Sequence, residues 1–331
     1  MKNSNPQDGP RVSVLIPTKN RARLLVRGLD ALRGQSDGDY EVIVSDNAST
    51  DDTAEVCRQY ADCFPSFRYI YQEVEIPAIS NWRACLDAAR GQYSFILCDD
   101  DVLIDPAFIS SGVDALSESG CSLLIPECML SNGERTVPVR IPLPQVVAGK
   151  EFFLRYWIKP YGAPIISCLF RTELARECDA FADPGILYAD IELWLKLMLL
   201  SDVYVYRRPA FIYSFHGGNI VTGMTIASHS ENIRFLDRVG TWGLHRELDS
   251  HVINKWKSRM VQHYLRRIVI PDCIGGRGNL FSFARMCLRN QTWGNATVSM
   301  LYYVGKKIRT FSLGAKTVFE LDSPKIDDRE A

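Results

Sequence analysis

"RVSVLIPTKNRARLLVRGLDALR", residues 11–33, joins an apolar run to an amphipathic one. Residues 11–18 predict a buried strand, and residues 21–33 predict a helix with one apolar face. The same alternation continues with EVIVSD, a second helix announced by STDD, the run FRYIYQ, a helix over residues 80–90, and YSFILCD. Strands that alternate with helices of about ten residues predict an α/β fold with a mostly parallel sheet covered by helices.

The composition is that of an ordinary globular protein. Of the 331 residues, 47% are hydrophobic and 23% are charged, which argues against a disordered chain. The net charge of -1 argues against a protein that binds nucleic acid over its whole surface. The ten cysteines form no CxxC pair and several lie in apolar runs, so we expect reduced cysteines and a cytoplasmic protein. No apolar run reaches the length of a membrane-spanning helix.

The pattern changes twice along the chain, which predicts three regions. Residues 1–10 are polar, and we expect them to be flexible. Residues 11–225 form the α/β domain, in which the regular alternation occupies about 11–120. Its second half, about 121–225, combines strands with the apolar helix YADIELWLKLMLL. From residue 226 to residue 331 the periodicity is almost wholly helical.

Polar clusters follow the predicted strands at the point where each strand stops. They are Pro17 to Asn20, Asp46 with Asn47, and Asp99 to Asp101. Because ligands of parallel α/β sheets bind at the carboxyl ends of the strands, we expect these clusters to meet in one site. Three adjacent aspartates repel one another unless a positive charge lies among them, which predicts a divalent cation held by carboxylate oxygens. A helix start at Asp105 is the alternative, and it leaves the triplet unexplained.

Together these stretches resemble family 2 glycosyltransferases of the GT-A fold. The matching segments are VSVLIPTKNRARLL, EVIVSDNASTDDT, SNWRACLDAARGQYSFILCDDDVL and YADIELWLKLMLL, followed by an aromatic strand, and they span residues 11 to about 220 in the family's order. The resemblance implies a Rossmann-like sheet and an inverting, metal-dependent transfer of a sugar from a nucleotide-diphosphate donor, a UDP-sugar. It implies an acceptor hydroxyl on a glycan or a lipid-linked molecule, in the synthesis of cell-surface polysaccharide.

The resemblance assigns most of the polar clusters to the nucleotide-sugar. Asp46 stands where the family has a carboxylate that accepts a hydrogen bond from a pyrimidine N3–H; the alternative is that Asp46 only caps a turn with Ser49. Pro17 and Thr18 would line the nucleoside pocket, and Arg21 lies close enough in sequence to meet a diphosphate. The donor-binding residues implied in this way are Pro17, Thr18, Asn20, Arg21, Asp46, Asn81, Asp99 and Asp100.

The metal motif of the family is a D-x-D pair, which the resemblance places at Asp99 and Asp101. Asp101 would bind Mn2+ or Mg2+ directly, and Asp99 or Asp100 would reach the ribose or bind the cation through water. Many relatives carry an aspartate where Cys98 stands, which leaves the register of the motif open. His216 is implied as a further metal ligand, and a structural histidine among aromatic residues is the alternative.

Asp190, at the start of the helix IELWLKLM, stands where the family has its general base. Such a carboxylate takes the proton of the acceptor hydroxyl as the oxygen attacks the anomeric carbon. An N-cap role is the alternative for Asp190, and Glu192 is the fallback base. Two other functions remain as alternatives: a non-catalytic binding protein on this scaffold, and a sugar nucleotidyltransferase. The latter normally has a glycine-rich loop after the first strand, and PTKNRARLL contains no glycine.

The helical tail is basic. Twelve cationic residues lie from Lys255 to Lys316, and Asp272 is the single acidic residue among them. They alternate with apolar and aromatic residues, which is typical of helices that lie on an anionic membrane surface. The tail therefore predicts a peripheral contact with the cytoplasmic face of a membrane, and a helical subdomain packed on the catalytic core is the alternative. Nucleic acid fits less well, because no binding motif accompanies the charge.

Overall fold

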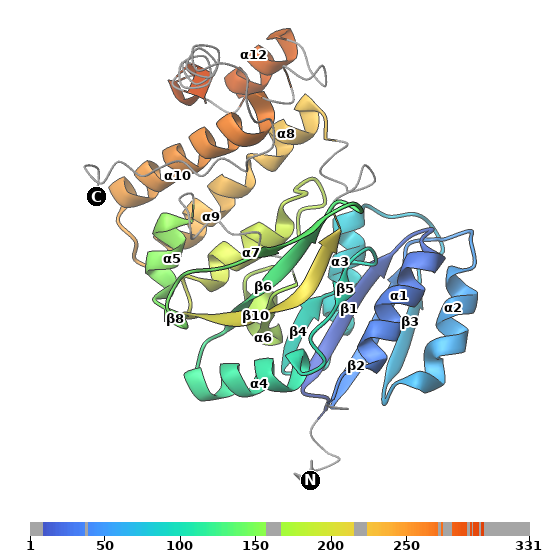
Figure 1. The fold of residues 1–331 in the computed structure, drawn as a ribbon. Coiled ribbons are helices and arrows are strands. Elements are labelled where there is room, and N and C mark those ends of the chain that lie inside the picture. Colours follow the sequence, from blue (N-terminus) through green and yellow to red (C-terminus); the bar gives the residue numbers. More distant parts are fainter. Residues whose placement is uncertain are drawn as a thin grey trace.

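The computed structural model of the chain describes residues 9–36, 39–156, 167–214 and 224–270, residue 273, residues 280–289, and residues 292, 294–297, 299 and 300. Its first part confirms the predicted alternation of strands and helices (Figure 1). In chain order the elements are β1 (Val12–Thr18), α1 (Ala22–Arg33), β2 (Tyr40–Asp46), α2 (Thr53–Tyr60), the short 3-10 turn η1 (Ala61–Cys63), β3 (Phe67–Tyr71), α3 (Ala78–Ala88) and β4 (Tyr93–Ile96).

The second part of the domain combines short strands with helices. In chain order the elements are β5 (Val102–Leu103), α4 (Phe108–Ser119), β6 (Leu123–Ser131), β7 (Thr136–Val139), β8 (Val146–Val147), α5 (Gly149–Arg155), β9 (Leu169–Arg171), α6 (Thr172–Glu177), α7 (Ala189–Leu197) and β10 (Val203–Ser214).

The helix that follows the aspartates starts later than Asp105 predicts. α4 begins at Phe108, and Ala107 is the residue that precedes it. The carboxylate of Asp105 accepts a hydrogen bond from the Ala107 backbone N–H at 3.1 Å. It also accepts hydrogen bonds from the Tyr206 hydroxyl at 2.7 Å and from Arg208 at 2.8 Å, both on β10. Asp105 therefore joins the segment before α4 to the sheet.

All ten strands form one sheet, whose main order is β3-β2-β1-β4-β9-β6-β10-β5, with β7 beside β6 and β8 beside β10 (Figure 1). The pairs β1–β2, β1–β4, β2–β3 and β6–β10 are parallel. The strands that pair only in the antiparallel sense, β5, β7, β8 and β9, have two to four residues each. The sheet is therefore mostly parallel by length, as the alternation predicts.

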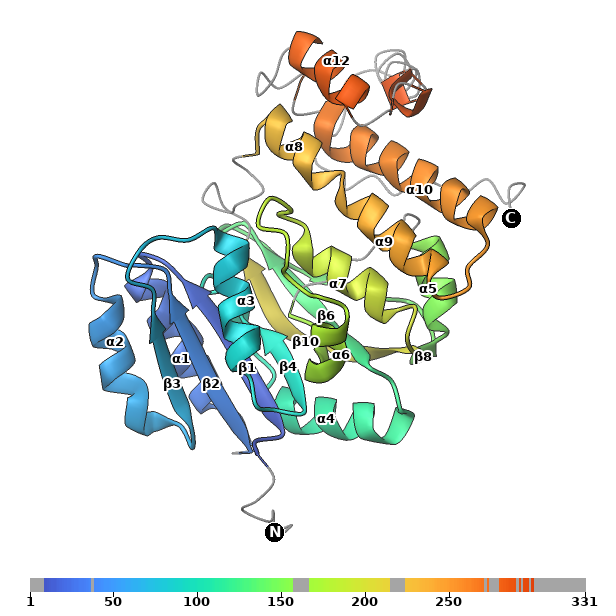
Figure 2. The ribbon, with the colours of Figure 1, turned by 180° about the vertical axis from the view of Figure 1, so that it is seen from behind.

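Alternate residues of the central strand β1 pack on opposite faces of the sheet. Val14 and Ile16 belong to a core formed with α1, α2 and α4, whereas Leu15 belongs to a core formed with α3, α5, α6 and α7. Helices α1 and α2 face the viewer in Figure 1, and α3 faces the viewer in the reverse view of Figure 2. Because both faces are covered, β1 is apolar along nearly its whole length.

The described part of the C-terminal region is helical and packs on the core that contains Leu15 and helices α3, α5, α6 and α7. Its elements are α8 (Ile226–Asn232), α9 (Phe235–Leu244), α10 (Ser250–Tyr264), the π-helical segment η3 (Leu265–Val269) and α12 (Leu280–Arg289). The Trp256 ring of α10 stacks on Phe153 of α5, with ring centroids 4.4 Å apart, and its Nε1 donates to the Phe153 carbonyl at 3.0 Å. The apolar side of α10 is thus buried inside the protein.

Gly91, between α3 and β4, gives a test of how tightly this scaffold is packed. A Cβ there would lie 2.5 Å from the backbone nitrogen of Ser13 and 2.7 Å from the carbonyl carbon of Val12. Because β1 is held by pairing on both sides, we expect Gly91→Ala to lower the free energy of unfolding by about 1–3 kcal/mol. In Gly28→Ala the new Cβ meets only the Leu97 side chain at 3.8 Å. This control should be neutral or gain up to about 1 kcal/mol from helix propensity. Equal urea midpoints for the two variants would contradict the prediction.

Candidate active site

The strand register brings the predicted polar clusters together at the carboxyl edge of the sheet. Thr18, the last residue of β1, pairs with Asp46, the last residue of β2, and Pro17 pairs with Ser45. The segment that follows β4 lies at the same edge, because the Thr18 hydroxyl donates to a carboxylate oxygen of Asp99 at 2.8 Å. The three clusters that the sequence places after separate strands therefore border one site.

Two asparagines hold the loops of this edge in place. Asn20 has a φ of 52°, a left-handed conformation that asparagine tolerates better than most residues. Its backbone N–H donates to the Ser49 hydroxyl and its side-chain oxygen accepts from the Thr50 N–H, each at 2.8 Å. Asn47 exchanges two hydrogen bonds of 2.8 Å with the backbone of Ile76. The loops after β1, β2 and β3 are thereby joined.

Asp46 is completely buried, and both of its carboxylate oxygens accept hydrogen bonds. One accepts from the Ser49 backbone N–H at 2.9 Å, and the other from the Tyr69 hydroxyl at 2.6 Å. Burial and this bond to Asp46 raise the pKa of Tyr69. The turn-capping contact with Ser49 is therefore present, and the hydrogen bond to a pyrimidine stays a prediction.

Asn81 supports the end of β2 from the first turns of α3. Its side-chain oxygen accepts from the Ser45 hydroxyl at 2.7 Å, and its side-chain nitrogen donates to the Ser45 carbonyl at 2.8 Å. Asn81 is buried. The structure thus gives Asn81 a structural contact, and its predicted contact with a donor remains untested.

Arg21 forms ion pairs with two aspartates of the triplet, and the shorter one is with Asp99. Arg21 donates from Nη1 to Asp99 at 2.7 Å and to Asp100 at 3.1 Å. Asp99 is buried, which raises its pKa, while Arg21 and the Thr18 hydroxyl act in the opposite direction. Arg21 thus pairs with two of the three buried carboxylates, those of Asp99 and Asp100.

Asp101 is the aspartate of the triplet that has a buried oxygen without a hydrogen-bond partner among the described residues. Its side chain is 1% exposed, one oxygen accepts from the Ser214 N–H at 3.3 Å, and the other is a buried Oδ2 without a hydrogen-bond partner among the described residues. Burial, and then the charge of Asp100, raise the pKa of Asp101 well above its ordinary value. Oδ2 of Asp101 is therefore satisfied either by a cation, with the carboxylate ionised, or by protonation, with the carboxyl group neutral.

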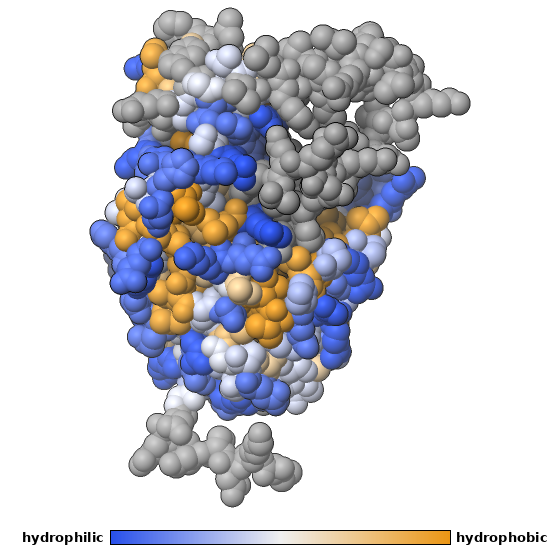
Figure 3. Space-filling view, turned by 90° about the vertical axis from the view of Figure 1, so that its left-hand side faces the viewer, coloured by the Kyte–Doolittle hydropathy of each residue, from blue (hydrophilic) through white to orange (hydrophobic). Residues whose placement is uncertain are grey.

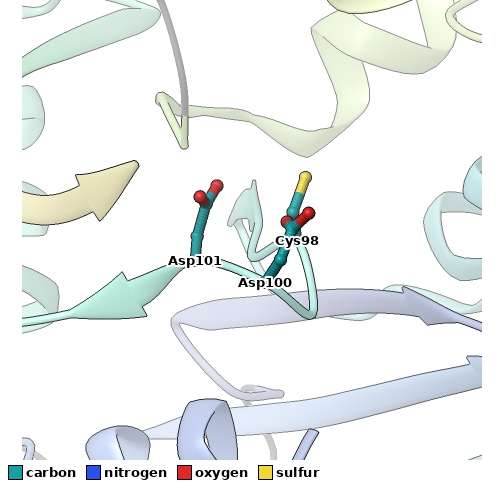
Figure 4. A group of neighbouring side chains, drawn as sticks. All are labelled: Cys98, Asp100 and Asp101. Carbon is teal, nitrogen blue, oxygen red and sulfur yellow. The ribbon is translucent and has the colours of Figure 1, made fainter. Parts of the chain in front are cut away.

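The ligand atoms that converge here are Cys98 Sγ and one oxygen each of Asp100 and Asp101, all within 4.8 Å of one another (Figure 4). We call these three residues the ligand group. Asp99, half of the predicted D-x-D pair, is turned towards Thr18 and Arg21 instead. The arrangement favours the register in which Cys98 occupies the family's first aspartate position.

Asp190, the second residue of α7, faces the same site. Burial raises the pKa of the Cys98 thiol well above its ordinary value. The charges of Asp101, Asp100, Asp99 and, to a smaller extent, Asp190 raise it further. One carboxylate oxygen accepts from the Ile191 N–H at 2.8 Å. The side chain keeps part of its surface open, yet surrounding protein atoms desolvate the carboxylate, and this burial raises the pKa of Asp190 to about 6. A carboxylate with that pKa can accept a proton near neutral pH.

Glu192, the fallback base, is not available for proton transfer. It is buried, not solvent-facing, and one of its oxygens binds Lys196 at 2.6 Å and Arg238 at 2.7 Å. These ion pairs occupy the Glu192 carboxylate within the helical core.

Tyr213 and Ser214, at the end of β10, are site residues that the sequence did not reveal. Ser214 donates to Asp101, and burial together with the charge of Asp101 raises the pKa of the Tyr213 hydroxyl. The aromatic run marks this stretch as a strand, but only its pairing with β6 and β5 brings it to the aspartates. His216, the further metal ligand implied by the sequence, lies outside the described residues.

The comparisons with known sequences agree with this geometry. Residues 13–176, about half of the chain, match the sequence model described as Glycosyl transferase family 2. A curated relative from Campylobacter jejuni, named GalNAc(5)-diNAcBac-PP-undecaprenol beta-1,3-glucosyltransferase, is 34% identical over 99 residues, which cover 30% of this chain and 32% of the relative. The chain spans between 23% and 32% of the length of three curated relatives that it matches.

Two solved structures share the fold. TarS of S. aureus, in complex with UDP-GlcNAc, has a TM-score of 0.70 at 14% identity, with 95% of each chain covered. The mannosyltransferase PcManGT of Pyrobaculum calidifontis, in complex with GDP-Man and Mn2+, has a TM-score of 0.53 at 17% identity, with 92% of this chain and 88% of that chain covered. The likeness confirms the predicted Rossmann-like GT-A fold.

Asp101→Asn should stabilise the chelator-treated protein more than Asp99→Asn does. An aspartate whose pKa rises on folding loses stability as the pH increases above its unfolded value of 3.8. At pH 7 we therefore expect Asp101→Asn to raise the free energy of unfolding, an advantage that vanishes near pH 3. Asp99→Asn should gain less, because the hydrogen bonds from Arg21 and Thr18 offset part of the burial that also raises the pKa of Asp99. Denaturant titration at both pH values measures the difference, and a loss of stability in both variants would be incompatible with an uncompensated Asp101.

Proposed function

The chain belongs to glycosyl transferase family 2, and on that premise we propose that it moves a sugar from a UDP-sugar to an acceptor hydroxyl, with inversion at the anomeric carbon. The observation that carries the proposal is the placement of the ligand group and Asp190 at one edge of the sheet. The reaction needs positive charge to stabilise the departing diphosphate and a base to take the proton of the acceptor hydroxyl. The ligand group would hold a cation that supplies the positive charge, and Asp190 would take the proton.

The nucleotide would bind over the loops that follow β1 and β2. Each oxygen of Asp46 accepts one hydrogen bond from the protein and retains a further lone pair. Because Asp46 is completely buried, a uracil N3–H would reach that lone pair only after the bordering side chains move. Pro17, Thr18 and Asn20 border the same edge. The complex of TarS with UDP-GlcNAc supports a UDP-sugar as the donor in this fold.

Asp100 and Asp101 would hold a divalent cation, Mn2+ or Mg2+. The buried, unpartnered Oδ2 of Asp101 fits such an ion, because a cation removes the cost of burying that charge. The complex of PcManGT with GDP-Man and Mn2+ supports the same assignment. When bound, the cation neutralises charge on the diphosphate as the sugar leaves. Asp99 and Arg21 would orient the ligand group from the side of β1.

Asp190 would act as the general base. Its position at the start of α7 leaves part of the side chain open to an acceptor, and its second oxygen forms no hydrogen bond within the described part of the chain. Proton transfer from the acceptor hydroxyl to this oxygen makes the acceptor oxygen a nucleophile. Attack in line with the departing diphosphate inverts the anomeric carbon.

The acceptor is proposed to be a glycan or a lipid-linked molecule, used in cell-surface polysaccharide synthesis. The printed name of the C. jejuni relative includes an undecaprenol-linked molecule, which supports the second type. Among the described residues no helix has the length and apolar character needed to cross a membrane. Because α10 buries its apolar side, a peripheral contact would depend on its basic residues and on the tail outside the described part. Co-sedimentation of the full chain with anionic vesicles, and release by salt, would test this contact.

A panel of sugar nucleotides tests the proposed function. We expect UDP-sugars to bind in the presence of Mn2+ and to undergo slow hydrolysis or transfer with release of UDP, and we expect chelation to abolish turnover. Calorimetry with UDP, UTP and UDP-sugars, followed by analysis of the products, provides the measurement. Release of pyrophosphate from UTP would instead identify a nucleotidyltransferase. Binding without turnover of any donor would identify a non-catalytic protein.

Asp190→Asn should lower kcat by about 10²–10⁴-fold with little change in UDP affinity, because only the proton acceptor is removed. In the wild type, the ionised base form is lost as the pH falls through about 6. We therefore expect kcat/KM to fall about tenfold per pH unit below that value. Glu192→Gln is the control: it should reduce stability by weakening two ion pairs but retain the pH limb. A pH limb that survives in Asp190→Asn would show that another group is the base.

A further inference from the structure

Cys98 occupies a position from which its sulfur can reach the proposed cation. It follows β4 by two residues, and its Sγ belongs to the ligand group with oxygens of Asp100 and Asp101, all within 4.8 Å. Figure 4 shows the three side chains projecting from the turn towards the same side. No described residue forms a hydrogen bond with this thiol. The ten cysteines of the chain form no disulfide among the described residues, so Cys98 is a free thiol.

The backbone explains why these three residues converge. The Asp101 N–H donates to the Cys98 carbonyl at 3.0 Å, which closes a tight turn over residues 98–101. The turn brings its first and last residues side by side and points Asp99 towards Thr18 and Arg21. A ligand set made of residues 98, 100 and 101 is therefore a property of the turn.

A second observation at this place points to a ligand. Asp101 is 1% exposed, and its Oδ2 has no hydrogen-bond partner in the described part of the chain. Arg21 reaches Asp99 and Asp100. The group thus contains an oxygen that is desolvated but unsatisfied, next to a sulfur. A cation bound to both would satisfy each of them.

We propose that Cys98 is a direct ligand of the divalent cation and that its sulfur gives the site a preference for thiophilic cations, such as Co2+, Zn2+ and Cd2+, over Mg2+. The proposal rests on the metal-dependent function proposed above. Sulfur ligands select softer cations, whereas Mg2+ takes oxygen ligands almost exclusively. As the metal–sulfur bond forms, the thiol proton leaves to solvent. A chain with aspartate at this position would present oxygen alone.

Titration of the full chain with Co2+ in the presence of UDP tests the proposal. We expect a near-ultraviolet charge-transfer band from the sulfur to Co2+ in the wild type and in Cys63→Ser, which removes an exposed cysteine as a matched control. The band should be lost in Cys98→Ser, and Co2+ affinity should fall at least about tenfold, because even indirect partners of a metal commonly contribute that much. Cys98→Asp should also lack the band and should shift the ratio of Mg2+ to Co2+ affinity towards Mg2+ by at least about tenfold.

The possible failures are distinguishable. If Co2+ binds with UDP but the wild type has no charge-transfer band, or if the band persists in Cys98→Ser, then Cys98 is not a ligand and the metal site itself still stands. If calorimetry detects no Co2+, Mn2+ or Mg2+ binding with or without UDP, the metal-dependent function fails together with this proposal. Retained UDP affinity and an unchanged circular dichroism spectrum in Cys98→Ser and Cys98→Asp establish that the variants are folded.

Discussion

Repulsion among three buried carboxylates on adjacent residues is the constraint on which the site depends. Two like charges about 4 Å apart repel by about 4 kcal/mol at an effective dielectric constant near 20, which is a large part of the stability of a typical domain. Arg21 and Thr18 compensate Asp99, and Arg21 also contacts Asp100. The remaining charge lies on the inner side of the turn, at Asp101. Among the described residues, nothing satisfies Oδ2 of Asp101, so a proton or a cation is needed there.

The sheet and the C-terminal helices share the task of positioning the site. The parallel register aligns the ends of β1 and β2, and contacts between their loops hold the nucleotide side. On the other side, the Asn232 side chain of α8 accepts from the Tyr188 N–H at 2.9 Å, directly before α7 and Asp190. The Tyr264 hydroxyl of α10 contacts Asn232 and His229. The basic helical region thus supports the start of α7 through a buried hydrogen-bond network.

Local patterns predicted most of the first half of the fold, because strand and helix periodicity and the polar residues at strand ends are encoded within short stretches. Local patterns could not predict contacts between residues that are far apart in the sequence. Nothing near Glu192 in the sequence indicates its bond to Arg238, which is 46 residues away, and nothing near Ser214 indicates Asp101. The spacing of Asp99 and Asp101 suggested a D-x-D pair, yet spacing does not describe the turn that points Asp99 towards Arg21. The family resemblance supplied the roles; the turn geometry favours a different register.

The environment of Asp190 shows how one helix can use two carboxylates differently. Glu192 forms ion pairs with Lys196 and Arg238, which occupy its carboxylate and hold it away from the site. Asp190 has no such partner among the described residues, and Ala189 before it adds no second carboxylate; desolvation is the largest cause of its raised pKa. With a pKa of about 6, roughly ten Asp190 side chains are ionised for each protonated one at pH 7. The base form therefore predominates, while its affinity for a proton exceeds that of an ordinary exposed aspartate. Burial without compensation, costly for stability, is what suits Asp190 to proton transfer.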